Sequence, residues 1–121
     1  MLADSRVSAV LPVVDLERAR KFYEEKLGLR AGDAPGGVMF ECGHGSQLAL
    51  YHRDSPTKAD HTAAGGEVDD VEKVVKDLRE KGVVFEQYEM TDEQGIATMG
   101  GVKGAWFKDS EGNILSVVQF E

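Results

Sequence analysis

One sequence pattern occurs twice, about half the chain apart, and it limits the folds that the chain can adopt. Each copy consists of a short apolar run, an aspartate, a run with helical periodicity and a glycine. The aspartates are Asp15 and Asp70, and the glycines are Gly28 and Gly82. Aspartate is preferred at the start of a helix, and glycine is common just after its end. The repeat therefore predicts two similar units.

The periodic run of each unit has one apolar side, which is typical of a helix that packs against a sheet. In LERARKFYEEKLG this side consists of Leu16, Ala19, Phe22, Tyr23 and Leu27. In VEKVVKDLREKG it consists of Val71, Val74, Val75 and Leu78, at the spacing i, i+3, i+4 and i+7. We expect both helices to bury these sides.

Segments rich in apolar and β-branched residues surround the helices and predict strands. Residues 7–14 precede the first helix, and VMFECG and SQLALYHRD follow it. The second helix is followed by VVFEQYEM, VKGAWFKDS and NILSVVQF. We interpret TDEQGIATMGG, which contains several glycines, as a loop. The connections between most of the predicted strands are short, which favours antiparallel pairing.

These elements predict an α+β fold of two βαβββ modules. The modules should form a curved, mainly antiparallel sheet, a cup, with the helices outside it. We expect a single domain of residues 1–121, with module one at about 6–54, a linker at about 55–60 and module two at about 61–121. The local patterns do not decide whether the modules pair within one chain or are exchanged between two.

Composition excludes several classes of partner. The net charge of −8 repels nucleic-acid phosphates, so we expect no nucleic-acid partner. No apolar stretch approaches the roughly 18 residues of a membrane span, and the first residues lack the features of a secretory signal. The single cysteine, Cys42, cannot form an intrachain disulfide, which fits a reducing compartment. We therefore expect a cytoplasmic protein without a membrane partner.

Three segments together resemble the vicinal oxygen chelate superfamily. They are LPVVDLERARKFYEEKLGL, GGEVDDVEKVVKDLREKGV and GAWFKDSEGNILSV, and the match covers nearly the whole chain. This superfamily includes glyoxalase I, bleomycin-resistance proteins and extradiol dioxygenases. The resemblance implies a cup of paired modules, and it implies a homodimer. It does not imply one reaction, because the superfamily contains lyases, dioxygenases, epimerases, thiol transferases and metal-free binders.

In the metal-dependent members, His, Glu or sometimes Gln ligands come from the first and last strands of each module. The resemblance places these positions at Ser8, at Leu50 to within one residue, at Ala63 and at Ser116. Alanine and leucine have no side-chain donor atom, and a serine hydroxyl is a poor ligand for Zn, Ni, Fe or Mn. We therefore predict no cofactor, no metal ligand and no catalytic residue at the superfamily's usual site.

An alternative metal site remains open at this stage. His52 and His61 each lie two residues from a usual ligand position, on the same side of an extended strand. With a carboxylate such as Glu67, they could hold a divalent ion such as Zn, Ni, Fe or Mn. The simpler interpretation is that both histidines are exposed to solvent beside the linker.

Without a metal, the cup is expected to be an apolar pocket with a few polar groups. Aromatic rings and methionines form adaptable walls for small organic molecules. The acidic charge is compatible with a cationic ligand, and the rings with an aromatic one. The candidate ligand-binding residues are Ser8, Phe40, Leu50, Tyr51, His52, Met99, Trp106 and Ser116.

The favoured function is that of a glyoxalase- or bleomycin-resistance-like protein that binds or sequesters a small organic molecule, as in antibiotic resistance. One alternative is a metal-dependent lyase or dioxygenase of the same superfamily with a displaced metal site. Another is a structural or regulatory dimer without catalytic activity. Whether the chain is an enzyme, and which ligand it binds, stay open on the sequence alone.

Overall fold

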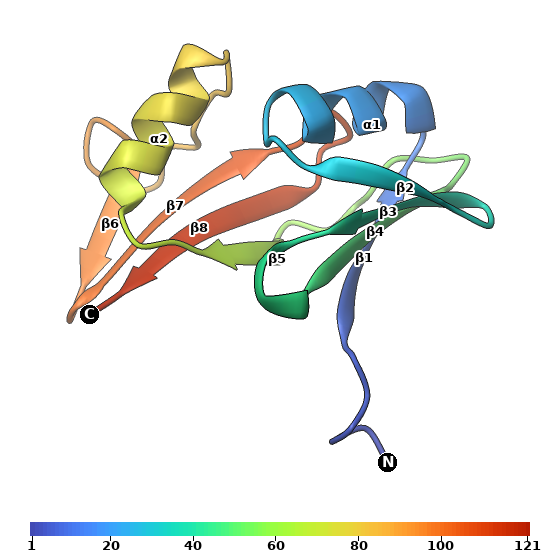
Figure 1. Cartoon of the computed structure of the whole chain (residues 1–121). Helices are drawn as coiled ribbons and strands as arrows, with labels where there is room; N and C mark the ends of the chain where they lie inside the picture. Colours follow the sequence, from blue (N-terminus) through green and yellow to red (C-terminus); the bar gives the residue numbers. More distant parts are fainter.

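The structure, a computed structural model, describes the backbone of residues 1–121 and every side chain except that of Asp33. Two βαβββ modules follow one another along the chain (Figure 1), as the repeat predicts. Module one consists of β1 (Ser8–Val13), α1 (Leu16–Glu25), β2 (Arg30–Ala34), β3 (Gly37–Glu41) and β4 (Gln47–His52). Module two consists of β5 (Thr62–Glu67), α2 (Val71–Glu80), β6 (Ile96–Met99), β7 (Val102–Lys108) and β8 (Ile114–Phe120).

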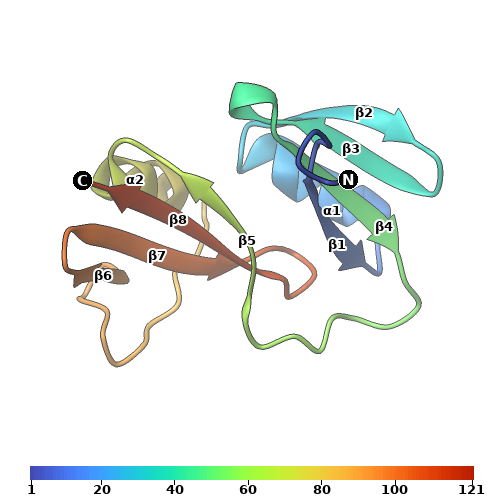
Figure 2. The ribbon, with the colours of Figure 1, turned by 90° about the horizontal axis from the view of Figure 1, so that it is seen from below.

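Each module forms one four-stranded sheet, with the orders β1-β4-β3-β2 and β5-β8-β7-β6. The first and last strands of each module pair in parallel, and the other pairs are antiparallel. Both helices lie on the same side of the sheets (Figure 1). The inner edge strands β1 and β5 face each other between the sheets (Figure 2). The predicted α+β cup with outer helices is therefore confirmed.

The helix ends match the sequence pattern. Asp15 and Asp70 cap α1 and α2, each accepting a backbone N–H three residues later. Gly28 and Gly82 adopt positive φ after the helices, a conformation that glycine adopts at little cost. Neither described helix is long and apolar enough to cross a membrane.

The strand predictions in module two need one correction. The segment VVFEQYEM contributes only an isolated bridge between Phe85 and Phe107, whereas β6 forms at Ile96–Met99, inside the predicted loop. Met99 pairs with Val102, so Gly100 and Gly101 alone make the hairpin turn. Both glycines have positive φ, as a two-residue turn of this kind requires. The glycine pair therefore marks a hairpin.

The hydrophobic core lies between the helices and the sheets. Tyr23 of α1 stacks on Phe40 of β3, with ring centroids 5.3 Å apart. On α2, Val71, Val75 and Leu78 are buried. The face of each sheet that is turned away from its helix, named here the open face, carries exposed apolar residues, which include Val10, Tyr51, Met99 and Phe120.

Candidate functional site

The strand registers align the two modules residue by residue. In module two, Ser116 pairs with Trp106 on one side and with Gly65 on the other. The turn before β8 closes with Asp109 N–H bonding the oxygen of Asn113, and the turn before β4 closes in the same way from Cys42 to Ser46. Three residues after Ser46 lies Ala49, which pairs with Met39 and Val10. The counterpart of Ser116 is thus Ala49, one residue before the predicted Leu50.

Phe40 and Leu50 do not lie on the open face. They are 0% and 2% exposed and belong to the core. Side chains alternate across a strand, so Leu48 and Leu50 point toward α1 while Ala49 and Tyr51 point to the open face. The prediction that Phe40 and Leu50 line the cup is therefore corrected: both side chains point toward α1, and the neighbouring residues Met39 and Ala49 point to the open face.

The other predicted ligand residues lie in several places. Trp106 is half-buried and meets the ring of Tyr88 edge to face, at a centroid distance of 5.7 Å. Ser116 is buried beside Gly65, where an added Cβ atom would lie 2.5 Å from the serine Oγ. Tyr51 and Met99 are exposed on the open faces of the two sheets.

The usual metal-ligand positions lack a suitable set of donor atoms. Ser8 donates its hydroxyl to Oε1 of Gln47 at 3.2 Å, and Ala63 lies where the pairing of β5 with β8 shifts register. Ala49 and Ala63 carry methyl groups only. Among the described side chains, no group of three or more His, Cys, Asp and Glu residues is arranged to hold a metal ion.

The two histidines of the alternative metal site are both exposed. Nε2 of His52 lies 3.9 Å from a carboxylate oxygen of Asp54. Nδ1 of His61 lies 3.2 Å from the backbone oxygen of Thr62. Each of these contacts is to a residue one or two positions away in the same segment.

A cleft of about 420 Å³ lies between the two modules. Module one contributes residues from β1, β4 and the segments after α1 and β3, and module two contributes β5, α2, β7 and β8. Of the predicted ligand residues, only Ser116 lines the cleft. The full lining is Ala9, Leu27, Leu29, Cys42, Ser46, Gln47, Leu48, Ala64, Gly65, Gly66, Val68, Val74, Leu78, Phe107, Leu115, Ser116 and Val117.

The sequence contains a signal for this cleft that the prediction missed. Leu27 and Leu29 flank Gly28, which follows α1, and Gly65-Gly66 lies in β5, where a Cβ atom added at Gly66 would meet no atom within 4 Å. A larger hollow of about 630 Å³ runs along α2. Charged side chains dominate the lining of that hollow, which is typical of a solvated helix surface.

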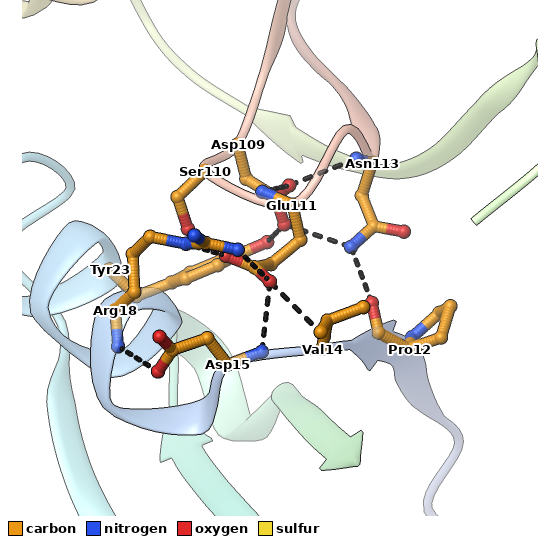
Figure 3. A network of polar contacts seen from close by, with 9 residues as sticks. All are labelled: Pro12, Val14, Asp15, Arg18, Tyr23, Asp109, Ser110, Glu111 and Asn113. Atoms are coloured by element: carbon orange, nitrogen blue, oxygen red, sulfur yellow. Dashed lines mark hydrogen bonds and ion pairs between the residues drawn. The ribbon is translucent and has the colours of Figure 1, made fainter. Parts of the chain in front are cut away.

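The turn between β7 and β8, named here the clasp turn (residues 109–113), joins the modules (Figure 3). Oε1 of Glu111 accepts the backbone N–H groups of Val14 and Asp15, each at 3.1 Å. Its Oε2 accepts Nε of Arg18 at 2.7 Å. Chiefly because of the Arg18 hydrogen bond, the pKa of Glu111 is lowered to about 2. This carboxylate therefore stays charged and orders the start of α1.

Asp109 completes the contact between the modules (Figure 3). Its Oδ2 accepts the hydroxyl of Tyr23 at 2.6 Å and Nδ2 of Asn113 at 2.9 Å. The same Asn113 amide donates to the backbone oxygen of Pro12 at 2.9 Å. Burial and the neighbouring Asp109 charge raise the pKa of Tyr23. Each of these polar groups has a partner, so the network holds the modules together.

Sequence comparison gives the family. The model of the Glyoxalase/Bleomycin resistance protein/Dioxygenase superfamily matches residues 6–117, which is most of the chain. The chain therefore belongs to this superfamily, as the resemblance predicts. A comparison with curated proteins found no match.

Solved structures of similar fold carry different activities in their names. A glyoxalase/bleomycin resistance protein/dioxygenase from Alicyclobacillus acidocaldarius superposes with a TM-score of 0.73 at 18% identity, covering 97% of this chain and 92% of the other. Lactoylglutathione lyase from Agrobacterium tumefaciens superposes with a TM-score of 0.72 at 21% identity, covering 97% of this chain and 95% of the other. The fosfomycin resistance protein FosX from Mesorhizobium loti superposes with a TM-score of 0.69 at 12% identity, covering 98% of this chain and 93% of the other. At these identities the likeness concerns the fold alone.

Proposed function

We propose that this chain binds and sequesters a small organic molecule without using a metal at the superfamily's usual position. The observation that carries the proposal is the cleft of about 420 Å³ between the modules, which reaches Ser116. Small-molecule sites are typically concave, mainly apolar and about 300–1,000 Å³ in volume. The cleft has these properties.

The residues at the usual ligand positions do not fit a metal ion. Ala49 and Ala63 supply no donor atom, and the hydroxyl of Ser8 is engaged with Gln47. Ser116 alone offers one weak ligand, whereas Zn, Ni, Fe or Mn sites in proteins need several imidazole, thiolate or carboxylate donors. The proposal therefore gives the metal no role.

The names of some relatives refer to resistance against toxic compounds. The superfamily's description includes bleomycin resistance, and one similar structure is called a fosfomycin resistance protein. Protection from a toxic compound is accordingly the biological role that we propose for this chain.

We further propose that the chain acts as a homodimer. On the open faces, Val10, Met99 and Phe120 are 58%, 58% and 57% exposed. Covering such side chains stabilises an assembly by about 25 cal/mol per Å² of apolar surface removed from water. Light scattering on a gel-filtration column should give twice the 13.2 kDa mass of one chain. A single-chain mass at micromolar concentration would count against the dimer.

The binding proposal is tested by a thermal-shift screen of neutral, cationic and aromatic compounds, with and without Zn, Ni, Fe and Mn. A ligand at 100 times its dissociation constant should stabilise the fold by about 2.7 kcal/mol, without added metal. Stabilisation that requires a metal and disappears in His52→Ala or His61→Ala would instead support the metal-dependent enzyme.

A further inference from the structure

We propose that the cleft takes an uncharged molecule with an apolar body and one hydrogen-bonding end, which lies toward the connection between β3 and β4. This inference rests on the proposed binding function and adds the class of ligand and its orientation. Three observations lead to it: the charge of the lining, the burial of its apolar residues and the position of its polar groups.

The first observation is that no residue lining the cleft is charged. Charged residues make up 30% of the chain, so an uncharged lining of this extent differs sharply from the rest of the surface. An ionic ligand would lose hydration in the cleft without gaining an ion pair, which is unfavourable. The lining therefore selects against both anions and cations, whatever the net charge of the protein.

The second observation concerns burial. Several apolar residues at the margin of the core are only partly buried, and the cleft exposes them. They come from both modules: Leu27, Leu29, Leu48, Ala64, Val68 and Val74. Because removing apolar surface from water is favourable, a ligand with an apolar body would complete the burial that the two modules leave unfinished.

The third observation is that three of the four polar residues that line the cleft lie at one end of it, the fourth being Ser116 in β8. Cys42, Ser46 and Gln47 all belong to the connection between β3 and β4 or its flanks. Oγ of Ser46 donates to the backbone oxygen of Gly43 at 2.7 Å and keeps its acceptor capacity. The thiol of Cys42 can donate or accept a weak hydrogen bond beside it. An alcohol or amide end of the ligand would match these groups.

The class of ligand is tested by competition. The neutral dye N-phenyl-1-naphthylamine, which fluoresces in apolar sites, is bound to the chain and displaced with 1-octanol, octanoate or octylammonium. These competitors share one alkyl chain and differ in charge. We expect 1-octanol to displace the dye at about a tenfold lower concentration than either ion. Stronger displacement by octylammonium would overturn the inference and leave the proposed function intact. No binding of dye or competitors would overturn both.

The position of the site is tested by filling the cleft. A Cβ atom added at Gly66 meets no atom within 4 Å, so the variant Gly66→Leu can extend into the cleft without a backbone clash. We expect this variant to bind the dye about tenfold more weakly. In the control Gly32→Leu, the added Cβ would lie 3.6 Å from the backbone oxygen of Met39, outside the cleft, and binding should not change.

Wild-type affinity in Gly66→Leu would overturn the assignment of the cleft, while the proposed function would survive if the dye still bound elsewhere. Thermal unfolding of both variants checks that they fold. If Gly66→Leu is unfolded, Val74→Phe fills the same cleft from α2 and is judged by the same loss of affinity.

Discussion

The turns between the last two strands of the modules have equal lengths and opposite roles. In module two, Asp109 donates its backbone N–H to the oxygen of Asn113 at 2.9 Å. In module one, Cys42 donates to Ser46 in the same way at 2.8 Å. The first turn is the clasp turn, whose carboxylates bond module one. The second contains no carboxylate, and its Cys42 and Ser46 border the cleft.

The helix starts show the same division. The backbone at the start of α1 bonds Glu111, which belongs to the other module. The first N–H of α2, from Val71, bonds Oε1 of Gln119 within its own module at 2.9 Å. A repeated scaffold thus has one turn that joins the modules and one that leaves an opening between them.

The largest expected effect comes from Asp109→Ala. This change leaves the Tyr23 hydroxyl and the backbone N–H groups of Glu111 and Asn113 without their acceptor. Since unpaired buried donors cost about 1–3 kcal/mol each, we expect a loss of about 3 kcal/mol in the free energy of unfolding, measured in urea. The matched change Cys42→Ala should cost about 1 kcal/mol or less. Equal losses in the two turns would contradict the division of roles.

The clasp turn should also respond to acid. The pKa of Glu111 is lowered to about 2 from an ordinary value of 4.5. The unfolded chain therefore binds a proton at higher pH than the folded chain does, and the carboxylate's stabilisation, complete above pH 4.5, is lost as the pH falls toward 2. Urea unfolding between pH 6 and pH 2.5 should show a smaller loss of stability in Glu111→Gln than in the wild type. Parallel curves would mean that Glu111 is not coupled to folding.

A smaller effect is expected where the modules differ in packing. A methyl group at Gly65 would meet Oγ of Ser116 at 2.5 Å, so Gly65→Ala should cost about 1–2 kcal/mol. The double variant Gly65→Ala/Ser116→Ala removes the clashing oxygen and resembles module one, where Val10 pairs with Ala49. We expect it to recover most of the loss in a double-mutant cycle. Additive losses would contradict the match between the modules.

The sequence predicted the fold well where a residue's local role, such as capping or ending a helix, determines its position. Asp15 and Asp70 cap helices, Gly28 and Gly82 follow their ends, and the fold follows from this repeat. Sequence reasoning failed where tertiary packing decides. Leu50 could face either side of β4 until the register with neighbouring strands was known.

The candidate site was harder to predict than the fold. Ser116, one of the predicted ligand residues, lines the cleft, and the rest of the lining comes from residues that would serve equally well in a hydrophobic core. Leu27, Val74 and Phe107 have no polar atom or spacing that distinguishes a ligand wall from a packed interior. The cleft depends on how far apart two folded modules stand, and apart from the glycine pair Gly65-Gly66 no local pattern indicates that spacing.

The most direct test of the central claim is an NMR titration of the ¹⁵N-labelled chain with 1-octanol. The account predicts that amide shifts concentrate at Gly66, Val74 and Leu115 of module two and at Ser46 and Leu48 of module one. Shifts confined to the open faces, at Tyr51, Met99 and Trp106, would contradict the claim that the ligand lies between the modules.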